Sequence, residues 1–129
     1  MKTRRLSNSV IFARFQSQPA DFLGLMDIFR LLSFTEGTSM TLLEAMSLGI
    51  PTVATRVGGT PEIVADDETG ILTESDNLGE FTGALKLLLS QLAKRKQRAQ
   101  KAKQRFRDRF SVAKMVKQYQ RLYEAGTGY

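Results

Sequence analysis

The chain has 129 residues, 42% of them hydrophobic, and carries a formal net charge of +6 at pH 7. This length fits a single domain built on one core, residues 1–129, and no apolar run is long enough to span a membrane. The sequence contains no cysteine and no histidine, which excludes disulfides and thiolate metal sites and leaves carboxylates, Lys, Arg, hydroxyls or the backbone for any catalysis.

Helix and strand signals alternate along the chain. Pro19 suits the first turn of a helix, Gly49 suits the end of one, and Asn77 with Glu80 suits the cap and third position of another. These signals predict helices over 19–26, 41–48, 77–90, 94–110 and 111–123, and a further helix starting at 60. Apolar runs predict strands over 10–12, 28–32, 52–55 and 71–73. Alternation of this kind indicates an α/β fold, in which a parallel sheet is flanked by helices. The expected core includes Phe12, Phe15, Phe22, Phe29 and Ile63.

The segment from Glu36 to Glu44 is the strongest candidate site. It follows the strand over 28–32, contains Gly37 in a loop, and ends inside the start of the helix over 41–48. Backbone N–H groups at a helix N-terminus favour an anion, and ligands of open α/β sheets lie beyond the carboxyl ends of the strands. A phosphate on the amides at 38–40, with a carboxylate on either side for hydroxyls, describes a nucleotide sugar.

The same residues carry a resemblance to a known family. Glu36-x7-Glu44, the following residues 45–55 and the string at 57–64 resemble the signature of family 4 retaining glycosyltransferases. Those enzymes have two Rossmann-like domains in the GT-B arrangement, and the C-terminal domain holds most of the donor. The resemblance implies that residues 1–129 are a partial, Rossmann-like donor-binding domain with C-terminal helices.

The resemblance also implies roles for individual residues. Glu36 would be the catalytic carboxylate that lies against the transferred sugar and opposes charge at its anomeric carbon. Glu44 would bind the ribose, and the amides of Ser39, Met40 and Thr41 would hold the distal phosphate. Gly37 would allow close backbone approach, with Thr38 near the sugar. The substrate would be a nucleotide diphosphate sugar, and we expect neither a cofactor nor a metal ion.

Structural alternatives exist for several of these residues. Thr41-x-x-Glu44 has the spacing of a capping box, in which Glu44 would serve the helix alone. The alternative for Glu36 is an exposed surface acid in a loop. Gly58-Gly59 is either a tight turn or a contact to the nucleotide. The consecutive acids at 66–68 indicate a solvated turn rather than a metal site, since oxygen-ligand sites need spaced ligands.

The basic charge is concentrated in one helix, over 94–110. An apolar stripe of Ala99, Ala102, Phe106 and Phe110 predicts a surface helix packed on the domain through that stripe. The alternative is an interaction protein that binds anionic lipid or nucleic acid through this helix. Nucleic acid is disfavoured because no aromatic residues interleave with the basic ones. The expected location is cytoplasmic, at the membrane face if the acceptor is lipid-linked.

The chain departs from its relatives in ways that bear on activity. Arg14 stands where relatives usually have Gly, Arg30 lies in a strand where an apolar residue is normal, and Ser39 occupies a position that is often Gly or Pro. The acceptor-binding domain and the basic pair that neutralises the diphosphate are missing. We therefore expect the isolated chain to be inactive without an N-terminal domain or partner chain, and its unpaired sheet edge to favour self-association. A non-catalytic nucleotide-binding or assembly module is the remaining alternative; the base, sugar and acceptor (a glycan or a lipid-linked molecule) stay open.

Overall fold

The computed structural model describes residue 6 and residues 8–126. Its centre is a parallel sheet of three strands, β1 (Phe29–Leu31), β2 (Thr52–Thr55) and β3 (Ile71–Thr73), in the order β1-β2-β3. Phe29 pairs with Thr52 and Val53 pairs with Ile71. These three strands confirm the α/β prediction, and β2 and β3 have the predicted bounds.

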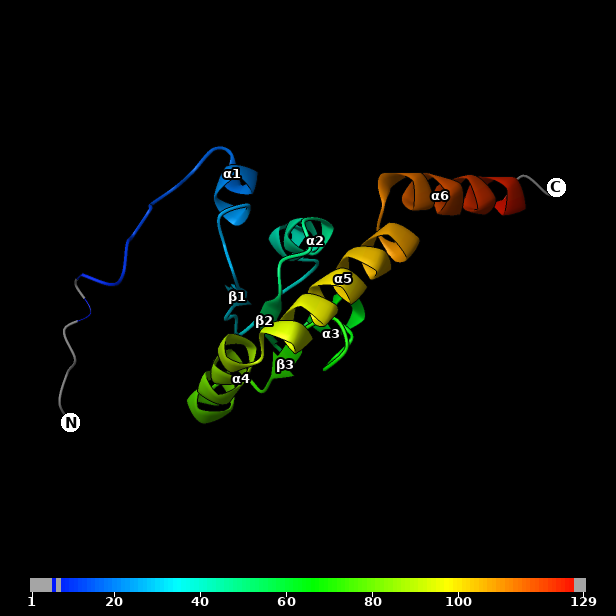
Figure 1. Cartoon of the computed structure of the whole chain (residues 1–129). Helices are drawn as coiled ribbons and strands as arrows, with labels where there is room; N and C mark the ends of the chain where they lie inside the picture. Colours follow the sequence, from blue (N-terminus) through cyan, green and yellow to red (C-terminus); the bar gives the residue numbers. More distant parts are fainter. Residues whose placement is uncertain (1–5, 7, 127–129) are drawn as a thin grey trace.

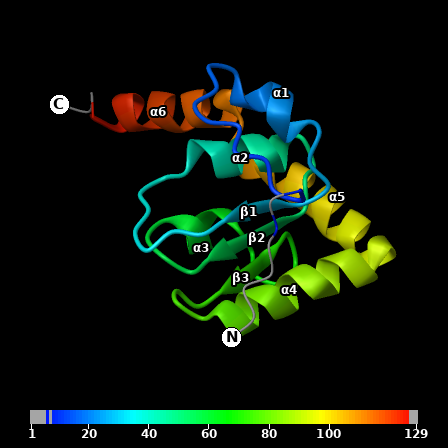
Figure 2. The same ribbon diagram turned by 90° about the vertical axis from the view of Figure 1, so that its left-hand side faces the viewer.

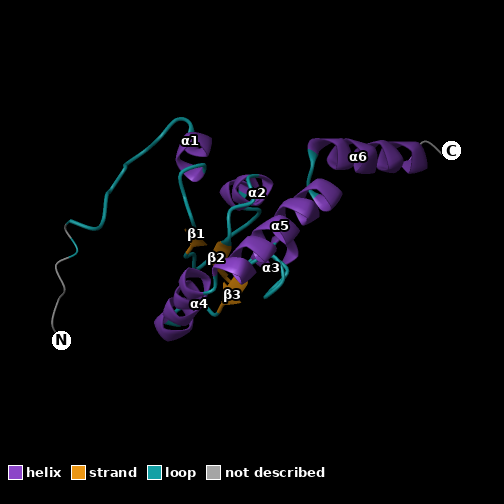
Figure 3. Cartoon of the chain, in the orientation of Figure 1, coloured by secondary structure: helices purple, strands orange, loops and turns teal. Residues whose placement is uncertain are grey.

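Helices cover both faces of this sheet (Figure 3). They are α1 (Pro19–Leu23), α2 (Met40–Ser47), α3 (Thr60–Ile63), α4 (Leu78–Ser90), α5 (Leu92–Arg109) and α6 (Val112–Gly126). The predicted caps of α4 and α6 are confirmed, because Asn77 accepts from the Glu80 amide at 3.0 Å and Ser111 Oγ accepts from the Lys114 amide at 3.3 Å. The Glu80 carboxylate instead accepts from the Glu74 amide, which ties the end of β3 to the first turn of α4.

Two apolar clusters hold the layers together. The larger cluster joins α2, α3 and α5 to one face of the sheet, through residues such as Leu42, Ala54 and Ala102. The smaller cluster joins α4 to the other face, through Val53, Phe81, Ala84 and Leu88. Every residue of β2 is buried, as expected for the middle strand of a parallel sheet covered on both faces. Figure 2 shows α2 and α4 on opposite sides of the strands.

The predicted strand over 10–12 is wrong. Residues 10–12 have no strand or helix structure, and Ile11 and Phe12 are 92% and 89% exposed. A strand needs a neighbour for its hydrogen bonds, and Figure 1 shows this segment running away from the sheet before α1. The core assignment is wrong for Phe12 and Phe15 for the same reason. It is also wrong for Phe22, which lies on α1 and is 40% exposed, whereas Phe29 and Ile63 are buried as expected.

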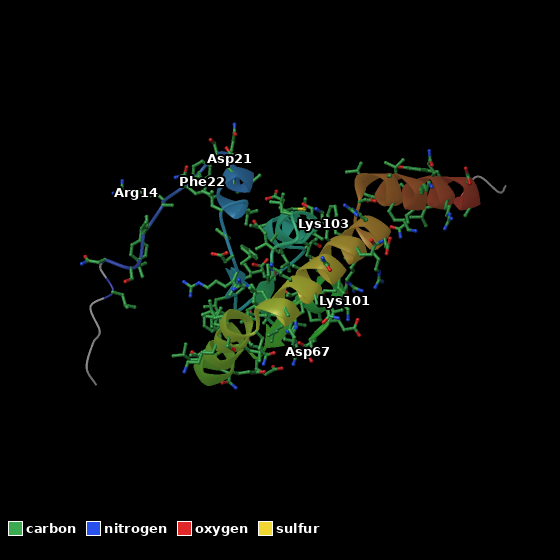
Figure 4. The ribbon with its side chains drawn as sticks, in the orientation of Figure 1. Arg14, Asp21, Phe22, Asp67, Lys101 and Lys103 are labelled. Atoms are coloured by element: carbon green, nitrogen blue, oxygen red, sulfur yellow. The ribbon has the colours of Figure 1, made fainter. Side chains whose placement is uncertain are left out.

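The two unusual arginines of the N-terminal half have simple positions. Arg30 lies on the edge strand β1 and is exposed, so its charge stays in water and needs no buried partner. Arg14 has a φ of 59°, in the left-handed region that Gly adopts most easily, and Figure 4 shows it far from the sheet.

Candidate functional site

The carboxyl ends of the three strands lie at one edge of the sheet because the strands are parallel. The loop over 32–39 follows β1, residues 56–59 follow β2, and residues 74–77 follow β3. This edge is where open α/β sheets bind ligands. It holds every residue from Glu36 to Thr41 that the sequence analysis selected, and Glu44 follows on the second turn of α2.

Glu36 is half-buried in the loop after β1. Its Oε1 accepts a hydrogen bond of 2.8 Å from Ser33 Oγ, and no partner for Oε2 is found among the described residues. Glu36 is therefore more than an exposed loop acid, since one oxygen is held by the protein and the other is open to a ligand.

The turn after β2 lies directly against the backbone of the Glu36 loop. A Cβ atom added to Gly58 would lie 1.6 Å from the Glu36 carbonyl oxygen, and one added to Gly59 would lie 2.7 Å from the Gly37 carbonyl oxygen. Gly58 also has a φ of 52°. Both glycines are thus required by packing within the protein, so the tight-turn interpretation is sufficient to explain them.

Gly37 differs from this pair. A Cβ atom at Gly37 would meet no protein atom within 4 Å, and its φ lies outside the left-handed region. Packing against the described residues does not require a glycine there. The space beside Gly37 is open, so the close approach of the backbone to a ligand that the resemblance implies stays a prediction.

The N-terminus of α2 presents free backbone donors at this edge. Ser39 is the N-cap, and its Oγ accepts from the Leu42 amide at 3.3 Å while its carbonyl accepts from the Leu43 amide. No acceptor for the amides of Ser39, Met40 or Thr41 is found in the part of the chain that the structure describes. Free N–H groups of this kind attract an anion, and they are the same amides that the sequence analysis assigned to phosphate.

The capping-box interpretation of Glu44 is wrong. Since the cap is Ser39 and not Thr41, Glu44 lies too far along the helix to reach back to the cap amide. Its side chain is half-buried and makes no hydrogen bond with any described residue. The carboxylate is therefore unused by the helix and free for a ligand.

A small ion-pair network closes the β3 side of the edge. Arg56, which follows β2, pairs with Asp66 and with Glu74. The pKa of Arg56 is raised, chiefly by the hydrogen bond that its guanidinium donates to the Asp66 carboxylate. Burial acts to raise the pKa of Asp66, but the Leu72 amide and the Arg56 guanidinium together outweigh it and hold the Asp66 pKa below its ordinary value. The network fixes the turn before β3 against the strand.

A hollow of about 230 Å³ opens between the loop after β1 and the start of α4. Its walls are mostly apolar and include Leu32, Phe34, Leu78 and Phe81, while Thr55 and Ser33 also line it. The hollow lies on the α4 side of the sheet, whereas α2 and Glu44 lie on the other side.

The basic helix α5 packs as expected through Ala99, Ala102, Phe106 and Phe110. Its cations flank this buried seam on two sides: Figure 4 shows Lys103 towards α2 and Lys101 towards the turn that holds Asp67. The exposed positions of this helix carry cations and also the glutamines at 97, 100 and 104.

Two arginines of α5 serve the fold. Arg98 pairs with Asp67, and Arg105 donates to the carbonyl oxygens of Glu62 and Ile63 at the end of α3. Burial lowers the pKa of Arg105, with a further contribution from Arg109.

Among the described residues, no helix has the length and apolarity needed to cross a bilayer, and no group of three potential metal ligands is found.

Sequence reasoning missed Ser33, Thr55 and Arg56 as parts of this edge. Thr55 contacts Ser33 across 22 positions of sequence, and Arg56 contacts Glu74 across 18. The only available signal was that each residue follows or ends a predicted strand, which places it at the carboxyl edge.

Comparisons with known proteins give a consistent result. Residues 1–105 match the model of the family described as glycosyl transferases group 1. N-acetyl-alpha-D-glucosaminyl L-malate synthase of Bacillus anthracis is 34% identical over 124 residues, which are 95% of this chain and 32% of that protein. A Campylobacter jejuni protein, N-acetylgalactosamine-N,N'-diacetylbacillosaminyl-diphospho-undecaprenol 4-alpha-N-acetylgalactosaminyltransferase, is 30% identical over 122 residues, 92% of this chain and 33% of that one.

A solved structure has the same arrangement of elements. Anabaena Alr3699/HepE in complex with UDP matches with a TM-score of 0.88 and 25% identity, over 93% of this chain and 33% of that chain. The same Anabaena protein has also been solved with UDP and glucose. The chain spans about a third of the length of the curated relatives described here.

Proposed function

The chain belongs to the group 1 glycosyl transferases, and on that premise we propose that it is the donor-binding part of an enzyme that transfers a sugar from a nucleotide diphosphate sugar to an acceptor. The observation that carries this proposal is the grouping of Glu36, the free amides of α2 and the unpaired Glu44 carboxylate at the carboxyl edge of the sheet. The two carboxylates can accept hydrogen bonds from sugar hydroxyls, and the amides that lie between them in the sequence can donate to a diphosphate.

Each group has a distinct role in the proposed reaction. The amides of Ser39, Met40 and Thr41 bind the distal phosphate at the positive end of α2. Glu36 accepts hydroxyls of the transferred sugar through its open oxygen and opposes the positive charge that develops at the anomeric carbon. Glu44 accepts the ribose hydroxyls one helical turn further on.

The assignment to a narrower family of glycosyltransferases rests on the resemblance of residues 36–64 to that family's signature. We place the chain among the family 4 retaining enzymes, so the transferred sugar keeps its anomeric configuration. The proposed chemistry uses no metal ion, because the α2 amides and basic groups outside this chain neutralise the leaving diphosphate. EDTA should therefore leave donor binding unchanged.

The acceptor half of the site lies outside these residues. We propose that the chain acts with an N-terminal domain or partner chain, and that 1–129 alone binds the donor without transferring sugar. The unpaired edge of β1 and the exposed side chains of Leu32 and Phe34 beside it are suited to cover by that partner, or by a second copy. A lipid-linked acceptor would place the enzyme in the cytoplasm at the membrane face; the name of the Campylobacter relative includes such a lipid diphosphate.

The test is ligand-observed NMR of the chain with UDP-glucose, GDP-mannose and ADP-glucose. Binding of one donor that Glu44→Ala abolishes would support the proposal and name the base. Glu68→Ala is the matched control, since it removes an exposed carboxylate from the turn before β3 and should leave binding unchanged. A folded chain that binds none of the three would refute the proposal. Donor binding without transfer, even with the missing half supplied, would instead indicate a non-catalytic nucleotide-binding or assembly module.

A further inference from the structure

Two hydroxyl side chains connect the sheet to Glu36. Thr55 is the last residue of the buried middle strand β2 and is 4% exposed. Ser33 is the second residue after the edge strand β1, and it lies between Thr55 and Glu36 in a chain of hydrogen bonds. Ser33 lies outside the signature that identified the site, and Thr55 is the last residue of its 45–55 string but was given no role in the site.

We propose that Ser33 and Thr55 are positioning residues that fix the Glu36 carboxylate in the orientation that receives the donor sugar. The proposal rests on the proposed function, because it assigns the sugar contact to Glu36. It adds two residues through which the rigid sheet controls that contact.

Thr55 holds the backbone of Ser33 on both sides. Its Oγ1 accepts from the Ser33 amide at 3.0 Å and donates to the Ser33 carbonyl at 2.8 Å. A hydroxyl has one hydrogen and two lone pairs, so the longer 3.5 Å approach to the Leu31 carbonyl is secondary. The side chain of Thr55 thus takes the place of the next β1–β2 ladder bonds after Leu31 and Ala54.

With its backbone fixed, Ser33 directs Glu36. Ser33 Oγ donates to Glu36 Oε1 at 2.8 Å, and this hydroxyl–carboxylate bond is of the stronger, charge-assisted kind. Anchoring one oxygen selects the carboxylate rotamer and leaves Oε2 free for a sugar hydroxyl. A long Glu side chain in a loop would otherwise sample several rotamers.

The backbone below Glu36 is held independently. Gly58 approaches the Glu36 carbonyl, as described above, so loss of the Ser33 hydroxyl should release the carboxylate without displacing the loop. The variants of Ser33 therefore test orientation of the side chain and not folding of the loop.

The binding experiment compares UDP with UDP-glucose, because their affinity ratio isolates the contribution of the sugar. Ser33→Ala should lower the preference for UDP-glucose over UDP by roughly tenfold, while UDP affinity and the unfolding midpoint stay close to wild type. Ser33→Thr keeps the hydroxyl and should restore the preference. Ser90→Ala, which removes a remote exposed Ser hydroxyl at the end of α4, is the matched control. An unchanged preference in Ser33→Ala would overturn the proposal.

A second measurement does not depend on donor binding. NMR three-bond couplings should report one fixed Glu36 χ1 rotamer in the wild type and in Ser33→Thr, and rotamer averaging in Ser33→Ala and Thr55→Val. The double variant Ser33→Ala/Thr55→Val should show no more averaging of the Glu36 χ1 rotamer than Thr55→Val alone, because both residues act through one chain of hydrogen bonds. A fixed Glu36 rotamer in Ser33→Ala would refute the proposal. If the wild type binds none of UDP-glucose, GDP-mannose and ADP-glucose, the proposed function fails, and the couplings alone decide whether Ser33 and Thr55 position Glu36; if it binds one of the other two donors, the same comparison is made with that donor and its nucleoside diphosphate.

Discussion

Replacing Gly58 by alanine tests how tightly the site loop is packed on the sheet. Gly58 has a φ of 52°, where an alanine costs about 1–2 kcal/mol. The new Cβ would also lie 1.6 Å from the Glu36 carbonyl oxygen, so one of the two backbones must move, at a cost of about 1–3 kcal/mol. The expected destabilisation of Gly58→Ala is therefore about 2–5 kcal/mol, a large part of the stability of a typical domain.

Two other glycines make this prediction a graded series. Gly59 has an ordinary φ of −78° but its Cβ would lie 2.7 Å from the Gly37 carbonyl oxygen, so Gly59→Ala should cost less than Gly58→Ala. Gly83 lies inside α4, where an added Cβ would meet no atom within 4 Å other than the neighbouring backbone of the helix itself. Gly83→Ala should stabilise the chain by about 0.5–1 kcal/mol, because alanine is the better helix former.

Urea unfolding followed by circular dichroism gives the three free energies, and amide NMR spectra report whether the loop over 36–38 has moved. A Gly58→Ala variant as stable as wild type would refute the close approach of the two loops. So would equal effects in Gly58→Ala and Gly59→Ala, because the contact and the backbone conformation both single out Gly58.

Three further predictions concern the same fold. Asp66→Asn should destabilise the chain at pH 7 by at most about 1 kcal/mol, since the Arg56–Asp66 pair is partly exposed. Because the folded-state pKa of Asp66 is lowered, the difference in unfolding free energy between variant and wild type should shrink as the pH falls below about 4. A constant difference in urea unfolding at pH 7, 5 and 3 would contradict this prediction. Ser39→Ala removes the cap of α2 and should cost about 1 kcal/mol in thermal unfolding, with Ser39→Gly closer to wild type; equal losses would show that the Leu42 amide does not depend on this hydroxyl. Leu88→Ala should cost about 2–5 kcal/mol because Leu88 is fully buried, whereas Leu89→Ala, at a residue 65% exposed, should change the unfolding free energy little; similar losses for the two leucines would disprove the packing of α4.

The elements that depend on local signals could be predicted from the sequence. β2 and β3 are short apolar runs bounded by glycine and proline signals, and the caps Asn77 and Ser111 act within three residues of themselves. The sequence predicts that α2 starts at Thr41, whereas its cap is Ser39; both residue types cap helices, so the residue type alone does not decide between them. The strand over 10–12 failed because an apolar run does not specify a partner strand.

The candidate site divides in the same way. The segment from Glu36 to Glu44 is continuous in sequence, and its resemblance to a family signature identified it. The contacts that support it are not continuous: Thr55 reaches Ser33, and Gly58 reaches Glu36, across about 22 residues. Neither contact could be predicted from a fixed sequence separation, because the length of the intervening helix and turn decides which residues meet.

The exposure of α6 has a consequence for how the molecule opens. Its residues from 112 to 126 are all exposed, although an apolar stripe from Val112 to Tyr123 runs along one side, and it projects beyond the end of α5 (Figure 1). Undocking this helix removes little buried surface, so its amides should exchange with deuterium through local opening. The amides of β2 are enclosed on both faces and should exchange only when the whole domain unfolds. Hydrogen exchange of one sample should therefore show two separate time scales, with the boundary between them near Ser111.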